Sequence, residues 1–178
     1  MGINKVAASW GFAEATLFFI VPDVWLSIVG RNSLKKGLIA CCYSLFGALL
    51  GGIILYWWGA YDFQAANAVI EIIPAINSDM LTRVHSELSF QGPIAVLLGP
   101  LSGTPYKTYA IQAANADMNF IVFLLISIPA RLIRFTFVAA ISYYVSQLIS
   151  AKTKLDPIFI ILGAWFLFYL FYFTIMPS

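Results

Sequence analysis

The sequence predicts an all-α integral membrane protein made of two inverted repeats, each a re-entrant helical hairpin followed by a spanning helix, with an extra C-terminal transmembrane helix. Three observations lead to this prediction. The chain of 178 residues is 61% hydrophobic and 10% charged, whereas a soluble domain carries about 25% charged residues. Its apolar residues form five long stretches. Two of these stretches are interrupted by proline beside ionisable side chains, which is not typical of a simple spanning helix.

The composition also excludes several classes of protein. It is not that of a cytosolic enzyme or a disordered tail, and a net charge of +2 provides no basic field for a nucleic acid. Cys41 and Cys42 are adjacent, and no Cys or His spacing typical of a metal site occurs. The sequence has no catalytic triad, phosphate-binding loop or dinucleotide motif. We therefore expect no enzyme activity, no catalytic residue, no metal and no cofactor.

The first apolar stretch, 7–29, is predicted to be a re-entrant hairpin that turns at Pro22. Asp23 follows this proline directly, and Glu14 lies in the same stretch. Irregular backbone at membrane depth is tolerated only where it is buried in protein or lines a wet cavity. We therefore expect two half-helices that enter and leave on one side.

The third apolar stretch, 93–114, is predicted to be a second re-entrant hairpin. It contains a run of helix breakers that ends with Gly103, Thr104 and Pro105, and Lys107 follows closely. A continuous helix through such a run is not expected. We place the turn at Gly103 and Pro105.

The remaining three apolar stretches, 38–58, 118–149 and 157–176, are predicted to span the membrane, because a spanning helix needs about 20 apolar residues. Within the first of them, Gly47 and Gly51 form a GxxxG pattern that lets another backbone approach closely. Alternatively, these small residues merely fill a packed bundle. In both cases this helix faces protein.

Segment 60–92 is more polar and is predicted to be an amphipathic connector. Leu81, Val84 and Leu88 fall on one helical face, which indicates a helix on the outer membrane surface or one that caps the bundle. A plain connector is the alternative.

The distribution of basic residues favours two re-entrant segments over five spanning ones. With two hairpins that re-enter, the positive-inside rule places one basic group on the cytoplasmic side together with the N-terminus. This predicts a multi-pass protein of the bacterial inner (plasma) membrane. Interrupted segments at matching places in two inverted halves are also typical of a transporter site. The cytoplasmic group comprises Lys5, Arg31, Lys35, Lys36, Lys152 and Lys154.

Five ionisable residues within the apolar segments form the predicted substrate or proton site. Each would cost about 2.5–3.5 kcal/mol at a helix centre unless it is paired, hydrated or able to reach the interface. We expect the carboxylates of the first hairpin to meet the lysine of the second hairpin and the arginines of the fourth stretch. The five residues are Glu14, Asp23, Lys107, Arg131 and Arg134.

Each of these charges also has a structural alternative. Asp23 could cap the second half-helix of its hairpin, and Lys107 could reach the interface along its own stem. Arg131 and Arg134 share one helix face, and a kink at Pro129 would bring them to the lipid headgroups.

Two motifs resemble a known family. Phe12-Ala13-Glu14 followed by Pro22-Asp23 is similar to the first re-entrant motif of the DedA/VTT family, also called SNARE-associated membrane proteins, in which an acid precedes a Pro-Gly-acid turn. The Thr104-Pro105-Tyr106-Lys107 turn resembles that family's second hairpin, where a basic residue precedes an Ala-Gly pair by eight positions, the spacing of Lys107 and Asn115. The likeness covers most of residues 11–150 and is closest to the short YqaA-type branch.

This resemblance implies a two-hairpin, inverted-repeat fold and the movement of lipids or lipid-linked phosphates across the bilayer, in some members with proton dependence. It implies that Glu14, Asp23 and Lys107 are functional positions. The expected partners are membrane lipids, with protons and a second copy of the chain as further candidates. Two other functions stay open: a proton-coupled small-cation or drug antiporter, and a membrane assembly or quality-control protein.

Overall fold

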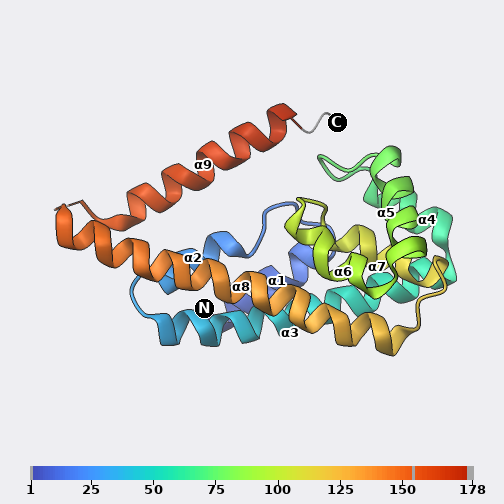
Figure 1. Ribbon diagram of the computed structural model, residues 1–178, viewed down its shortest axis with the longest axis horizontal. Coiled ribbons are helices and arrows are strands. Elements are labelled where there is room, and N and C mark those ends of the chain that lie inside the picture. Colours follow the sequence, from blue (N-terminus) through green and yellow to red (C-terminus); the bar gives the residue numbers. More distant parts are fainter. Residues whose placement is uncertain (1, 154, 176–178) are drawn as a thin grey trace.

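The computed structural model describes residues 2–153 and 155–175, and within them the chain is helical and has no strand (Figure 1). The predicted all-α class is therefore confirmed. The helices pack as a layered bundle, with the last helix standing away from the others at its C-terminal end. In chain order they are α1 (Ile3–Ala15), α2 (Asp23–Gly30), α3 (Leu34–Tyr61), α4 (Phe63–Ile70), α5 (Ser78–Gln91), α6 (Pro93–Leu98), the 3-10 helix η1 (Gly99–Leu101), α7 (Tyr106–Asn115), α8 (Phe120–Lys152) and α9 (Pro157–Ile175).

Among the described helices, three are long and apolar enough to cross a membrane: α3, α8 and α9. They coincide with the three stretches that the sequence predicts to span, and they indicate a membrane protein. Helix α8 runs without interruption through Pro129. Lys154, one of the basic residues assigned to the cytoplasmic side, and Met176, the last residue of the third predicted span, lie outside the described residues.

The first proline-bearing stretch is broken. Helix α1 ends at Ala15 and α2 begins at Asp23, so residues 16–22 form a connection without helical structure. Pro22 immediately precedes α2, a position where the fixed φ of proline is compatible with the start of a helix. The two helices find different partners, because α1 packs on α3, whereas α2 packs mainly on α8.

The second proline-bearing stretch is also broken, at residues 102–105, between η1 and α7. Gly103 has a φ of +91°, a backbone conformation that glycine adopts without steric cost. A Cβ there would meet no other atom within 4 Å, so the backbone angle and not crowding favours glycine. Pro105 is extended and directly precedes α7. Each break is thus followed, after one further helix, by a long apolar helix.

Small residues bring α1 into close contact with α3. A Cβ on Gly47 would lie 2.0 Å from the carbonyl oxygen of Ala8, and one on Gly11 would lie 2.2 Å from that of Ser44. The Ser44 hydroxyl adds a hydrogen bond of 3.0 Å to the carbonyl of Ala7. The GxxxG face is therefore occupied within the chain, by the first helix.

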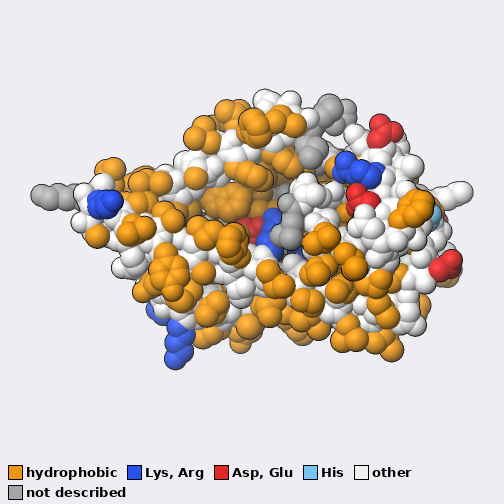
Figure 2. All heavy atoms as spheres, viewed as in Figure 1, with side chains coloured by type: hydrophobic (Ala, Val, Ile, Leu, Met, Phe, Trp, Pro, Cys, Tyr) orange, Lys and Arg blue, Asp and Glu red, His pale blue; other side chains and the backbone are white. Residues whose placement is uncertain are grey.

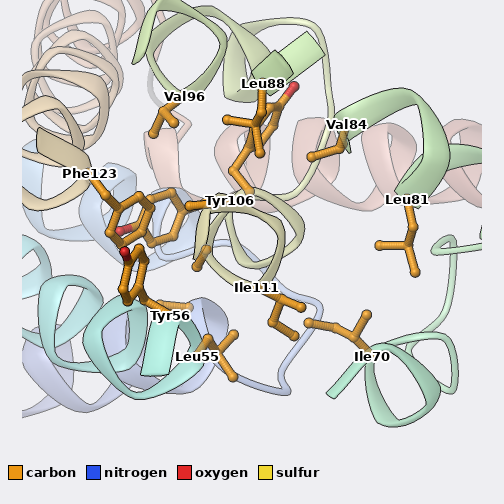
Figure 3. Packing of buried hydrophobic residues seen from close by; sticks show 14 of the residues in the cluster. Leu55, Tyr56, Ile70, Leu81, Val84, Leu88, Val96, Tyr106, Ile111 and Phe123 are labelled. Atoms are coloured by element: carbon orange, nitrogen blue, oxygen red, sulfur yellow. The ribbon is translucent and has the colours of Figure 1, made fainter. Parts of the chain in front are cut away.

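Segment 60–92 forms two helices, α4 and α5, that cap one end of the bundle. Leu81, Val84 and Leu88 are buried on α5, as their periodicity predicts. They pack against α7, which lies at the centre of the larger hydrophobic core (Figure 3). Helix α7 is buried along most of its length, and this fixes the side chains at its start in place.

Candidate functional site

A cavity of about 530 Å³ lies where the two helix breaks face each other. Helices α8 and α9 and the turn between α4 and α5 complete its walls. Figure 2 shows this hollow below α9, with basic and acidic side chains visible on its floor and a hydrophobic surface around it. Four charged residues line it: Glu14, Asp23, Lys107 and Arg134.

Glu14 pairs with Arg131 in the interior. A carboxylate oxygen of Glu14, near the end of α1, accepts a hydrogen bond from Nη2 of Arg131 on α8. Both side chains are almost fully buried. The guanidinium also lies 4.7 Å from the ring centroid of Tyr106 and 5.0 Å from that of Phe135, an arrangement that stabilises a buried cation. Arg131 does not itself line the cavity, so it acts by holding Glu14, which does.

Asp23 pairs with Arg134 one helical turn further along α8. Nε of Arg134 donates to Oδ2 of Asp23 at 2.8 Å, and its Nη1 donates to the carbonyl of Pro100 at 3.4 Å. One arginine thus contacts Asp23, which directly follows the first helix break, and Pro100, which lies just before the second. Burial raises the pKa of the Asp23 carboxyl, and the guanidinium opposes this shift. Oδ1 of Asp23 is buried without a hydrogen-bond partner among the described residues.

Lys107 makes a different contact from the one expected. We expected a carboxylate as its partner, but its Nζ donates to the backbone carbonyl of Phe18 at 2.6 Å. No ion pair joins it to a carboxylate within residues 2–153 and 155–175. Phe18 lies in the first break, where carbonyls lack helical partners, so a carbonyl is the acceptor within reach. Burial lowers the pKa of this ammonium.

These charges make contacts other than those that the structural alternatives require. The Asp23 carboxylate accepts hydrogen bonds from Arg134, and among the described hydrogen bonds it accepts none from a helix N–H. Lys107 is 2% exposed and does not reach the surface. Arg131 and Arg134 point to the acids, because α8 continues through Pro129 and keeps both on the inner face.

The residues of the predicted turns also lie at the cavity. Gly103 and Pro105 line it, and Pro22 is buried between two lining residues, Val21 and Asp23. The residues at which the sequence predicts the two turns therefore lie at the cavity or directly beside residues that line it.

One wall of the cavity was not predicted. It is lined by Trp165, Phe168, Tyr169 and Tyr172 of α9, a helix that the sequence predicts only as an extra span. Their spacing of three or four residues places them on one helix face. In a helix that is apolar all round, this face does not stand out, so periodicity alone could not find it.

The arrangement suits an anionic group. Two acids are matched by two arginines, and the ammonium of Lys107 adds a positive charge that no described carboxylate balances. Lysine and arginine bind phosphate through charge-assisted hydrogen bonds. In the part of the chain that the structure describes, no group of His, Cys, Asp and Glu side chains could hold a metal ion.

Comparison with known proteins yields a distant relative. A protein of Haemophilus influenzae named "Uncharacterized protein" is 27% identical over 156 residues, which cover 85% of this chain and 80% of that protein. No protein-family model matches the chain, and no solved structure matches it.

Proposed function

We propose that this protein moves lipids or lipid-linked phosphates across the membrane, as a flippase or scramblase does, through the charged cavity between its two helix breaks. The observation that carries the proposal is Lys107, a buried ammonium at the cavity whose described partner is a neutral carbonyl. A phosphate headgroup would supply the negative charge that this ammonium lacks.

The finer topology belongs to the same proposal. We take each proline-bearing break as the turn of a re-entrant hairpin, the first open to the cytoplasm and the second to the opposite side, in two inverted repeats. The short helices on either side of each break support this reading, as does the resemblance to the DedA/VTT family. The protein then lies in the bacterial inner membrane with a cytoplasmic N-terminus, and proton dependence is part of the proposal.

Two contacts favour lipid transport over the other candidate functions. A proton-coupled cation antiporter needs Glu14 or Asp23 to be available with the basic residues turned away, whereas both acids contact arginines. An assembly protein would use the GxxxG face for a partner, but α1 covers Gly47 of that face.

Transport can be tested in liposomes that contain the purified protein and a trace of lipid with a fluorescent acyl chain. Dithionite destroys the dye in the outer leaflet, so a further loss of signal measures movement from the inner leaflet. We expect the protein to accelerate the fluorescence loss of labelled phosphatidylglycerol relative to protein-free vesicles. The acceleration should be smaller for labelled phosphatidylcholine. If neither lipid loses fluorescence faster than in protein-free vesicles, at any pH from acidic to alkaline, the proposal is rejected.

A further inference from the structure

The cavity lies against the inner face of α9, and on the side of α2 this helix stands between the charged floor and the outside of the bundle. We propose that a lipid reaches the floor sideways from the membrane, between α9 and α2, and that Tyr169 holds this route closed through a hydrogen bond to the first helix break. This inference rests on the proposed function and adds the route and the residue that controls it.

Helix α9 is a wall and also the boundary to the lipid. Four aromatic side chains face the cavity, while Phe166, Leu170 and Phe171 are exposed. In Figure 1, α9 leaves the end of α8 and diverges from it toward its own C-terminus. A lipid that passes beside this helix keeps its chains in hydrocarbon and brings its headgroup to Lys107 without crossing water.

Helix α9 is also the wall that is held least firmly. Of its described residues, Ile161 alone is buried. The α2–α8 contact, by contrast, is so close that a Cβ on Gly30 would lie 2.8 Å from the carbonyl oxygen of Ala139. Segments with few buried contacts open at the lowest free-energy cost. If one wall moves, we therefore expect it to be α9.

Two hydrogen bonds join the aromatic face of α9 to the first hairpin. The hydroxyl of Tyr169 accepts from the backbone N–H of Val21 at 2.9 Å, and Nε1 of Trp165 donates to Oγ of Ser27 at 3.0 Å. Val21 lies in the break, where its N–H has no helical acceptor. Tyr169 thus satisfies a backbone donor two residues before Asp23, and it connects the movable wall to the charged floor.

The base of α9 lies beside the end of α2. Asp156, just before the helix, forms an ion pair of 2.6 Å with Arg31, which follows α2. Pro157 then begins the helix. This half-exposed pair adds little stability by itself, but it identifies the end of α9 that stays near the bundle, and breaking the bonds of Tyr169 and Trp165 frees the rest of the helix to move outward.

The test compares Tyr169→Phe with Tyr144→Phe in the purified protein. Both variants lose one tyrosine hydroxyl, but Tyr144 is exposed on α8, does not line the cavity, and has no hydrogen bond from its hydroxyl among the described ones. Amide hydrogen exchange of the peptide covering 16–23, in lipid nanodiscs, reports whether the bond to Val21 is lost. The dithionite assay reports transport. We expect Tyr169→Phe to raise both the exchange rate and the transport rate about fivefold, the effect of one hydrogen bond lost from the closed state, and Tyr144→Phe to leave both unchanged.

The two proposals fail in different ways. If the unchanged protein transports lipid and Tyr169→Phe speeds exchange but not transport, lateral access past α9 is rejected and the proposed function stands. If exchange at 16–23 is unchanged in Tyr169→Phe, the closing role of Tyr169 is rejected. If the unchanged protein moves no lipid, the proposed function is rejected together with the route that depends on it.

Discussion

The ammonium of Lys107 donates a hydrogen bond to the backbone carbonyl of Phe18, which lies 89 positions earlier in the chain. One residue follows the second helix break and the other lies in the first, so this bond joins the two across the cavity. A lysine ammonium has three donor hydrogens, and among the described residues it has this single acceptor. The remaining donors are available to an anionic ligand.

Removal of this charge is the most direct test of the proposed site. We expect Lys107→Gln to lower the transport rate of fluorescent phosphatidylglycerol at least about tenfold, because a hydrogen bond to a charged group contributes about 1.5–3 kcal/mol. The matched control is Lys36→Gln, which removes one exposed lysine at the start of α3. An equal loss in both variants would contradict a specific role for Lys107.

Transport should also depend on pH. Lys107 lies on α7, outside the three helices that are long and apolar enough to cross a membrane, and burial lowers its pKa from 10.5. The positive charge is therefore lost as pH rises through the lowered pKa, and we expect the transport of anionic lipid to fall with it. Lys107→Arg keeps its charge because the guanidinium pKa exceeds about 12, so its transport should stay constant over that pH range. A fall of equal size in Lys107→Arg would show that another group titrates.

Stability should change with pH in the opposite sense. Between the lowered pKa and 10.5, the unfolded chain binds more protons at this lysine than the folded chain does. Linkage then makes the free energy of unfolding increase with pH across this interval. Denaturation in detergent, compared between the unchanged protein and Lys107→Gln, measures the contribution of this residue, which should be absent from the variant.

Breaking the Glu14–Arg131 pair should destabilise the fold. Arg131→Met leaves a buried carboxylate without its cation, and removal of one partner of a buried pair costs about 3–5 kcal/mol. The double variant Glu14→Leu, Arg131→Met should recover part of this loss, because no charge is left unpaired. Arg31→Gln is the control, since Asp156 of that pair is half exposed and exposed pairs contribute about 0–1 kcal/mol. Thermal unfolding in detergent measures the relative stabilities of these variants. A double variant less stable than Arg131→Met would contradict the prediction.

The α1–α3 contact predicts a contrast between two glycines. Gly47→Ala places a methyl group 2.0 Å from the carbonyl oxygen of Ala8, and overpacking of this kind costs about 1–3 kcal/mol. Gly163→Ala on α9 meets no atom within 4 Å and gains helix propensity. We expect a lower unfolding temperature for Gly47→Ala and an equal or higher one for Gly163→Ala. Equal stability of the two variants would show that the helices separate without cost.

Much of the fold follows from local patterns. The three uninterrupted apolar stretches form α3, α8 and α9, and both proline-bearing stretches are broken near their prolines. The leucine and valine periodicity identifies the buried face of α5. Each of these features depends on residues close together in sequence, so hydropathy and the backbone limits of proline are sufficient to predict it.

The partners of the charged residues could be predicted only as a group. The free-energy cost of a charge in hydrocarbon predicts that the acids and bases lie close together. It does not predict that Glu14 pairs with Arg131 or that Asp23 pairs with Arg134. It also misses the carbonyl of Phe18 as the partner of Lys107, because every residue has a backbone carbonyl and sequence does not show which of them lack a helical partner.

By itself, then, the sequence determined the helical class, the apolar stretches, the two breaks and the set of ionisable residues that require polar or charged partners. These features depend on composition and short-range backbone sterics. The tertiary structure alone decided the pairing of those charges, the cavity they line and the aromatic wall that α9 adds to it. These features arise from the angles at which distant helices pack, and a uniformly apolar helix such as α9 carries no sequence pattern that shows which of its faces turns inward.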